Sequence, residues 1–429
     1  MEADRPSRSH QRPMVTSRLA IESIAAGGDG VGRSEGLAVF VPRTAPGDVV
    51  DAALDIRGRF ARGSVVRLIE PSAQRVDPVC VHYERDRCGG CQLQHLSYDA
   101  QLGAKSAIVR DAMQRIGKRD VATVSVRPSP SAWAYRTKLT LALRWLGDRW
   151  IAGLHRYDNP DAVFQLQECP ITDDRVLDVW HDVLGASMML PRAKRLRGAV
   201  RLAPGGASFV LEGGTRWPAV AQFAERVGSV ATVWWEPVGG RRRLLVDRRT
   251  SSTLGADRTT QSPDAAFVQV NPAAAVGLHE HVVALAMSHS PTVAVDAYAG
   301  AGATALALAE RGVTVTAIEL DVDAARWTAA HLPAGSRSVV GRVEDALPGA
   351  LPADVVLLNP PRGGVDERVT AALEASSPRS IVYVSCNPAT LARDVQRLSR
   401  FRIASISSFD LFPQTAHVET VCELVPEAA

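Results

Sequence analysis

The sequence of 429 residues is longer than one ordinary domain, so two or three domains are expected. Its 46% hydrophobic and 22% charged residues are typical of a soluble globular protein, and no apolar run is long enough to span a membrane. Residues 1–13 are polar and arginine-containing, without the apolar core of a signal peptide, which predicts a cytoplasmic protein with no membrane partner. A net charge of only +3 means that any nucleic-acid binding must come from local basic surfaces.

The segment 14–72 has an all-β pattern. Short β-rich runs alternate with glycine-rich turns, which predicts a compact five-stranded barrel of the OB-like kind. The motifs GGDGVG at 27–32, VFVP at 39–42 and PGD at 46–48 resemble the TRAM domain, an RNA-binding barrel attached to several RNA-modifying enzymes. The resemblance implies that this barrel contacts RNA.

A cysteine cluster follows the predicted barrel. Cys80, Cys88 and Cys91 supply three thiols, and two glycines between the last two allow the backbone to wrap close to sulfur. A single short segment rarely closes a tetrahedral sulfur site, so Cys169 is the natural candidate for the fourth ligand. Four thiolates suit either zinc or a [4Fe-4S] cluster, and their spacing does not separate the two.

Residues 97–117 form a predicted amphipathic helix that is expected to pack on the catalytic domain. The motif CGGC at 88–91, followed by QHLSY at 94–98 and QL at 101–102, resembles the S-adenosylmethionine-dependent RNA uracil-5-methyltransferases, specifically the branch with a TRAM domain and an iron-sulfur cluster. The resemblance implies a [4Fe-4S] cluster on the four cysteines. The spacing from Cys80 to Cys88 is two residues longer than the family pattern, which lengthens a loop and keeps the ligand count.

The segment 73–258 is predicted to be a central α+β domain that carries the cluster. Its arginines are dense at 192–201 and 241–249. For any single arginine a solvated surface is the simpler interpretation, but as a set they favour a face that neutralises RNA phosphates.

The segment 259–429 alternates strands and helices in the manner of a doubly wound, Rossmann-like domain. A glycine-rich turn follows the strand at 293–296, and later strands each end in a polar residue. Because the carboxyl ends of parallel strands share one edge of a sheet, these residues predict an S-adenosylmethionine site. They are Asp296, Tyr298, Gly300, Gly302, Glu319, Asp345 and Asn359.

The strand at 381–384 runs directly into a Ser-Cys-Asn-Pro turn. This pattern places Cys386 at the carboxyl edge of the sheet, where α/β enzymes hold their reactive groups, although buried structural cysteines are also common. By resemblance to the family, Cys386 is the nucleophile that adds to C6 of uracil, Glu419 is the base that removes the C5 proton, and Gln269 contacts the methyl donor or the substrate.

One position departs from the family. Asn359 stands where an aspartate is usual, and amine-methylating enzymes use an Asn-Pro-Pro turn. The alternatives are therefore an RNA or protein amine methyltransferase and a non-catalytic RNA-binding factor. The favoured interpretation is a monomeric uracil-5-methyltransferase acting on 23S ribosomal RNA, with transfer RNA as the second choice.

Overall fold

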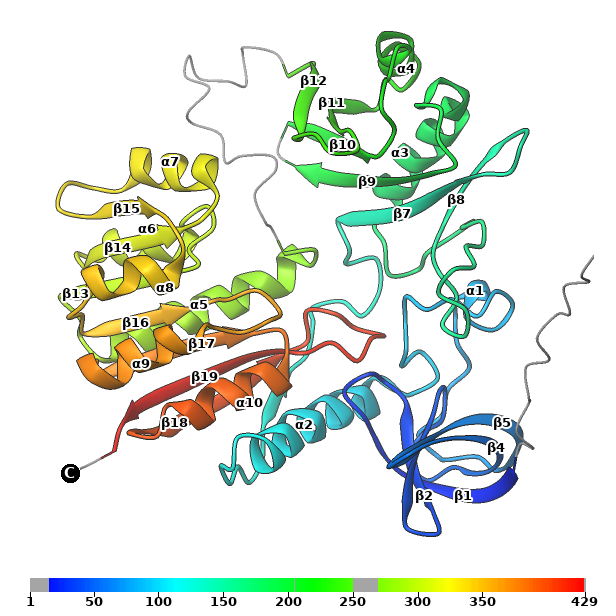
Figure 1. Cartoon of the computed structure of the whole chain (residues 1–429), viewed down its shortest axis with the longest axis horizontal. Helices are drawn as coiled ribbons and strands as arrows, with labels where there is room; N and C mark the ends of the chain where they lie inside the picture. The colour runs from blue at the N-terminus through cyan, green and yellow to red at the C-terminus, as the bar shows by residue number, and fades with distance from the viewer. Residues whose placement is uncertain (1–14, 204, 250–268, 428–429) are drawn as a thin grey trace, which may run out of the picture.

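The computed structural model describes residues 15–203, 205–249 and 269–427. It contains a small barrel, a six-stranded sheet and an eight-stranded sheet; in Figure 1 the barrel lies below the six-stranded sheet on the right, and the eight-stranded sheet lies on the left. The predicted N-terminal tail at 1–13 and the predicted boundary between residues 258 and 259 lie outside the described residues. None of the described helices is long and apolar enough to cross a membrane.

The N-terminal unit is a closed five-stranded barrel, as expected from the sequence. Neighbouring strands follow the order β1-β2-β3-β5-β4, and small and branched apolar side chains such as Val39, Val41 and Ala52 fill its interior. The strands are β1 (Val15–Ile24), β2 (Gly30–Ser34), β3 (Leu37–Val41), β4 (Val49–Arg57) and β5 (Phe60–Glu70).

The central sheet has the order β12-β11-β10-β9-β7-β8, and helices α3 and α4 pack on one of its faces. Its strands are β7 (Lys138–Trp145), β8 (Trp150–Gly153), β9 (Arg195–Ala203), β10 (Gly206–Glu212), β11 (Val230–Glu236) and β12 (Arg243–Asp247). The covering helices are α3 (Asp174–Gly185), with Trp180 buried against the sheet, and α4 (Val220–Arg226). Short α1 (Val81–Glu84) and 3-10 helix η1 (Ser187–Met189) lie in the connections.

The eight-stranded sheet has the order β15-β14-β13-β16-β17-β19-β18-β6. Its first five strands are mutually parallel, whereas β19 runs antiparallel to both neighbours. The bounds are β13 (Val293–Ala297), β14 (Thr314–Glu319), β15 (Arg337–Val340), β16 (Val355–Leu358), β17 (Ser380–Ser385), β18 (Phe401–Phe409) and β19 (Glu419–Pro426). This is the doubly wound arrangement predicted from the sequence.

Helices cover both faces of this sheet because its strands alternate apolar side chains to either side. Two helices share a core with one face: α5 (Pro272–Ser288) and α6 (Ala303–Ala309). The opposite core includes side chains of α2 (Tyr98–Arg115), α8 (Val343–Ala346), α9 (Glu367–Ser376) and α10 (Pro388–Arg397). The sheet is completed by α7 (Val322–His331) beside β15 and by 3-10 helix η3 (Leu347–Ala350).

Helix α2 joins the parts of the chain. Its N-cap Ser97 accepts a hydrogen bond from the backbone of Ala100, and its buried Val109 and Met113 pack in the core beneath α10. The following strand β6 (Ser125–Arg127) pairs with β18 at the edge of the eight-stranded sheet. The segment that the sequence analysis placed in the central domain therefore adds a helix and a strand to the C-terminal sheet.

Candidate active site and cysteine cavity

The predicted donor-binding residues gather at one edge of the eight-stranded sheet. Parallel strands β14, β13, β16 and β17 lie side by side, so their carboxyl ends meet there. Across the sheet these ends carry Glu319, Asp296, Asn359 and Cys386. Asp296 and Cys386, which are 90 positions apart in the sequence, are thereby brought to one edge of the sheet.

The glycine-rich turn after β13 is shaped by backbone that favours glycine. Gly302 has a φ of +74°, and a Cβ atom there would lie 2.5 Å from a methyl group of Thr328. The N–H of Gly300 donates to Oε2 of Glu319 over 2.8 Å, and the N–H of Asp321 donates to Oε1 of the same carboxylate over 2.7 Å. Glu319 is thus fixed at the strand end, beside the turn.

Asp296 is a buried carboxyl with spare hydrogen-bonding capacity. Its side chain is 4% exposed, and its Oδ2 atom has no hydrogen-bond partner among the described residues. The pKa of Asp296 is raised to about 7, mainly by burial, with a smaller contribution from the charge of Glu319. An acceptor of this kind at the sheet edge is suited to a cationic or hydrogen-bond-donating ligand.

The remaining predicted donor-site residues lie in different environments. Tyr298 is half-buried in the turn after β13, with a φ of +63°. Asp345 is exposed in α8 and forms a 2.8 Å ion pair with Arg368. The side chain of Gln269 has a buried Oε1 atom without a described partner, and it lies just before α5.

Cys386 and Glu419 face each other across neighbouring strands. Ser385 of β17 pairs with Thr420 of antiparallel β19, so the next position on each strand brings Cys386 opposite Glu419. Glu419 is 3% exposed, and burial raises its pKa to about 7. Burial also raises the pKa of the Cys386 thiol, and the nearby Glu419 charge adds to the shift.

Arg362 is a site residue that the sequence analysis did not single out. Its guanidinium lowers the pKa of both Cys386 and Glu419, against the larger effect of burial. The backbone carbonyl of Arg362 accepts from the Asn387 side chain over 3.2 Å, which connects the turn after β16 to the turn that carries Cys386. The available signal was its place at the end of the turn that begins with Asn359.

The segment 410–417, which leads into Glu419, is held by distant parts of the chain. Gln101 of α2 donates through Nε2 to Oε1 of Gln414 over 2.9 Å and accepts from the Gln414 backbone N–H over 2.9 Å. The N–H of Leu93, in the cysteine-rich loop, donates to the Gln414 carbonyl over 2.9 Å. The predicted cysteine site and the predicted catalytic base are therefore connected through one short loop.

The four predicted cysteine ligands line one cavity of about 250 Å³. All four, Cys80, Cys88, Cys91 and Cys169, are free and buried. Burial is the main cause that raises the pKa of the first three thiols, and the neighbouring Cys169 raises each of them further. Within the described ranges, no three His, Cys, Asp or Glu side chains form a group that holds one metal ion. The four thiols instead lie around the cavity.

The sequence matches known proteins over nearly its whole length. The family described as tRNA (Uracil-5-)-methyltransferase matches residues 333–425. An "Uncharacterized RNA methyltransferase" of Protochlamydia amoebophila is 30% identical over 426 residues, covering 94% of this chain and 96% of that protein. The chain belongs to the RNA (uracil-5-)-methyltransferase family. A second relative from this family, an "Uncharacterized RNA methyltransferase" of Thermosynechococcus vestitus, is 33% identical and covers 96% of this chain and 98% of its own length.

A solved structure shares the fold of this family member. Pyrococcus abyssi tRNA (uracil-54, C5)-methyltransferase, in complex with S-adenosyl-L-homocysteine, matches with a TM-score of 0.69 and 23% identity, covering 95% of this chain and 99% of that one. The likeness extends over the barrel and both sheets. The predicted family membership is thus confirmed, and the chain is an RNA methyltransferase by family.

Proposed function

We propose that this protein methylates C5 of uridine in RNA through a covalent adduct on Cys386. The observation that carries the proposal is that the pairing of β17 with β19 ends at Ser385 and Thr420, the neighbours of Cys386 and Glu419, and that the Glu419 charge raises the pKa of the Cys386 thiol. A nucleophile and a base in register at the carboxyl edge of the sheet meet the two requirements of this reaction. Amine methylation needs neither of them.

The roles of the residues follow from the chemistry of uracil. C5 is a poor nucleophile, so the Cys386 thiolate first forms a bond to C6 and moves electron density towards C5 and O4. S-adenosylmethionine supplies an electrophilic methyl group to C5. Glu419 then removes the C5 proton, the C5–C6 double bond re-forms, and the C6–S bond breaks to release the thiolate. A base with a pKa of about 7 is suited to that step near neutral pH.

We assign the donor site to the turn after β13 and its neighbours at the sheet edge. The buried Oδ2 of Asp296 and the buried Oε1 of Gln269 both lack described partners, so each is free to accept a hydrogen bond from a ligand. Glu319 would bind ribose hydroxyl groups, as expected of an acid after the second strand. Asp345 is assigned to the adenine, with Tyr298, Gly300, Gly302 and Asn359 completing the site.

A second candidate function is favoured by Asn359. Its side chain is exposed directly after β16 and offers a carbonyl acceptor of the kind that amine methyltransferases use. The residue after the two prolines is Arg362 and not an aromatic, and its charge lowers the pKa of the Cys386 thiol. This effect favours the uracil reaction, which needs the thiolate.

We infer that the cysteine cavity holds a [4Fe-4S] cluster. The four donors are all sulfur, which suits an iron-sulfur cluster or zinc, and they surround about 250 Å³ of space. A cluster of eight atoms occupies more volume between its ligands than one ion does. Anaerobic purification followed by metal and sulfide analysis tests this: about four irons and four sulfides per chain support it, and stoichiometric zinc contradicts it.

The favoured substrate is 23S ribosomal RNA, with transfer RNA second. The barrel and the four cysteines support this choice, since together they resemble the branch that acts on ribosomal RNA. We further propose that the protein works as a cytoplasmic monomer.

The deciding experiment is incubation with 5-fluorouridine-substituted ribosomal or transfer RNA and S-adenosylmethionine. Fluorine at C5 cannot be removed as a proton, so a denaturation-resistant protein–RNA adduct should accumulate and map to Cys386. The RNA that gives the adduct identifies the substrate. If unsubstituted RNA accepts methyl groups and no adduct forms, the amine reaction replaces the uracil reaction.

A further inference from the structure

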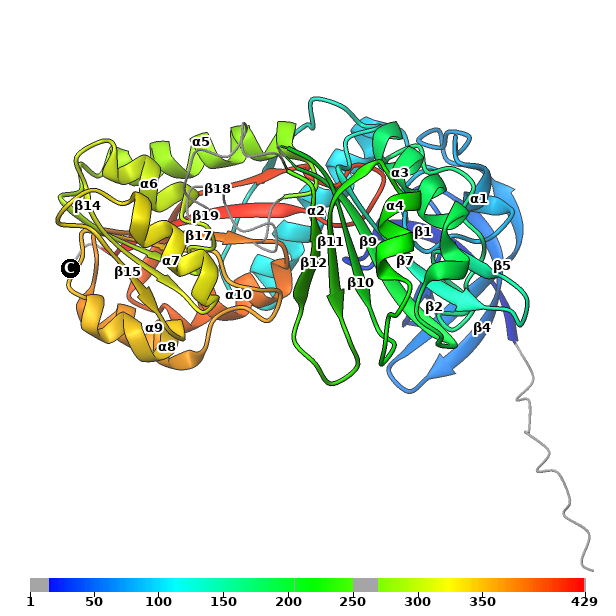
Figure 2. The same cartoon turned by 90° about the horizontal axis from the view of Figure 1, so that it is seen from above.

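One half of the central sheet carries a row of basic side chains on the face away from α3 and α4. Leu139, Leu141 and Leu143 of β7 point into the core beneath the helices, so the intervening residues point to the other side. Figure 2 shows the sheet standing between these helices and the eight-stranded sheet. The face without helices is therefore turned towards the methyltransferase side.

The basic residues on this face lie directly opposite one another. In the pairing of β7 with β9, Lys138 is opposite Arg201 and Arg144 is opposite Arg195. Like charges in directly opposed positions of a sheet are destabilising. Between these two pairs, Arg197 is 62% exposed and forms a 2.9 Å ion pair with Glu212.

Three of these basic residues lack an ion pair of this kind. Lys138 and Arg195 are exposed and Arg144 is half-buried, and none of the three has a carboxylate ion pair in the part of the chain that the structure describes. The nearby Arg195 charge contributes, after burial, to a lowered pKa of Arg144. A bound anion would neutralise this repulsion between the basic side chains and so stabilise the folded protein.

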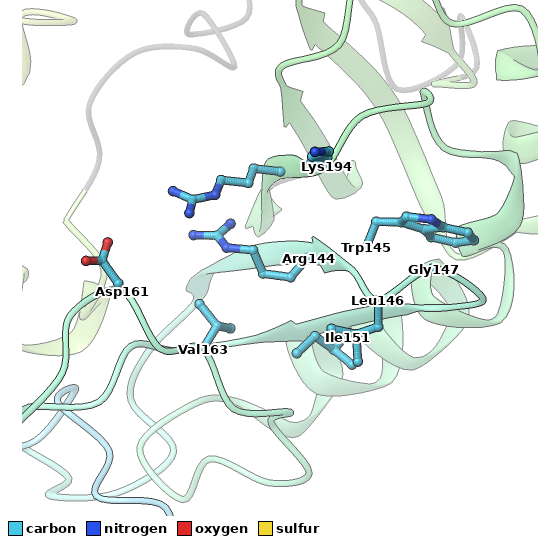
Figure 3. A pocket seen from close by; sticks show the side chains of 9 residues that line it. Arg144, Trp145, Leu146, Gly147, Ile151, Asp161, Val163 and Lys194 are labelled. Carbon is cyan, nitrogen blue, oxygen red and sulfur yellow. The ribbon is translucent and has the colours of Figure 1, made fainter. Parts of the chain in front are cut away.

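The far end of the row opens into a pocket of about 540 Å³. Arg144, Lys194 and Arg195 line it, together with the single acid Asp161, so its charged lining carries a net charge of +2. Figure 3 shows Arg144 extending into the pocket towards the side of Asp161. Two arginines and a lysine around one space are suited to a phosphate group.

The near end of the row adjoins the candidate active site. The N–H of Thr137, next to Lys138, donates over 2.9 Å to the carbonyl of Val270, which neighbours the predicted site residue Gln269. The six steps from Lys138 to Arg144 span about 20 Å along the strand. The row thus extends from the neighbourhood of Gln269 to the pocket over the length of several phosphates.

We propose that the pocket of Arg144, Lys194 and Arg195 binds a backbone phosphate of the RNA at a distance from the target uridine, with Lys138 and the β9 arginines contacting the phosphates between. The proposal rests on the proposed function, because it assumes that the target lies at Cys386. Such contacts position the strand and are independent of its base sequence.

The test compares two double variants that remove the same charge. Arg144→Gln with Arg195→Gln removes two of the three pocket cations and leaves a charged lining of Lys194 and Asp161 with no net charge. Arg311→Gln with Arg402→Gln removes two exposed cations from the sheet edge opposite the active site. Binding of a labelled long oligouridylate, and of a short one that fills only the active site, is measured by fluorescence anisotropy over a salt series. Thermal melting and S-adenosylmethionine binding establish that each variant is folded.

The pocket variant should bind the long RNA about tenfold more weakly, and its plot of log affinity against log salt should be less steep by about 0.7, the value for one lost phosphate contact on a single strand. The short RNA should bind as it does to the unaltered protein, and the control variant should match the unaltered protein with both RNAs. Equal salt slopes for the two double variants would overturn the proposal.

The same variants separate this inference from the proposed function. If the 5-fluorouridine adduct forms but the pocket variant keeps the full salt dependence, the reaction stands and the phosphate site is wrong. If no adduct forms but the pocket variant still shows the smaller salt slope with the long RNA, the phosphate site is supported and the covalent reaction is contradicted.

Discussion

Lys105 and Asp410 form a fully buried ion pair that connects helix α2 to the loop before the candidate base. The Nζ atom of Lys105 donates to Oδ1 of Asp410 over 2.5 Å, and neither side chain is exposed. Lys105 also donates to the carbonyl of Phe412 over 3.0 Å. Residues 305 positions apart thus fix the segment that leads to Glu419.

Removing one member of this pair should be costly. Lys105→Met leaves Asp410 buried without its counterion, and we expect a loss of roughly 3–5 kcal/mol in the free energy of unfolding. The double variant Lys105→Met with Asp410→Asn has no uncompensated charge and should recover part of that loss. Urea unfolding measures both. A loss of less than about 1 kcal/mol in the single variant would contradict the structural role of the pair.

Glu419→Gln should separate the two halves of the proposed reaction. The amide cannot remove the C5 proton, so addition of Cys386 and methyl transfer proceed while release stops. We expect ordinary uridine RNA to give an adduct that survives denaturing electrophoresis, with turnover reduced by at least about a hundredfold. Cys386→Ser is the matched control and should give no adduct. Normal turnover in Glu419→Gln would exclude Glu419 as the base.

The rate of turnover should rise with pH. The reaction needs the deprotonated forms of Glu419 and Cys386, and burial raises the pKa of both, to about 7 for Glu419. Turnover should therefore increase between about pH 6 and about pH 8. Adduct formation by Glu419→Gln depends on Cys386 alone, so its pH profile should lack the ionisation near 7. A flat turnover profile over this range would contradict the assignment.

The same ionisation should affect stability with the opposite sign. A carboxyl whose pKa is higher in the folded protein than in the unfolded chain favours the folded state while it is protonated. The stabilisation from neutral Glu419 is fully present below about pH 4.5 and is lost as the pH rises through about 7. In Glu419→Gln, thermal unfolding should show a smaller decline over this interval. An unchanged decline would show that Glu419 is not responsible.

Asn359 provides the test between the uracil and amine reactions. If the side chain only accepts a hydrogen bond near the pyrimidine, Asn359→Asp should keep adduct formation and Asn359→Ala should lower it about tenfold, the cost of one hydrogen bond. In an amine methyltransferase, Cys386→Ala would retain methyl transfer. Retention by that variant, measured with radiolabelled donor, would overturn the covalent mechanism.

Much of the architecture was predictable because local patterns are strong where strands are buried on both sides. The strand at 381–384 and its turn were recognised from β-branched residues followed by a Pro-containing turn, and β17 ends at Ser385, immediately before Cys386. The helix predicted at 97–117 is α2, with its N-cap at Ser97. No local pattern predicts that β6 joins the eight-stranded sheet, because a three-residue strand is too short to show a periodicity.

The residue types, their order and the family can be inferred from the amino-acid sequence: four cysteines, a glycine-rich turn, and a cysteine and a glutamate near the C-terminus. Which of these residues lie together depends on the fold. Pairing of β17 with β19 sets Cys386 against Glu419, and the turn after β16 brings in Arg362. Opposed cations on β7 and β9 likewise appear only once the strands are in register. Strand register is a long-range property, fixed by packing between distant segments, so no local pattern contains it.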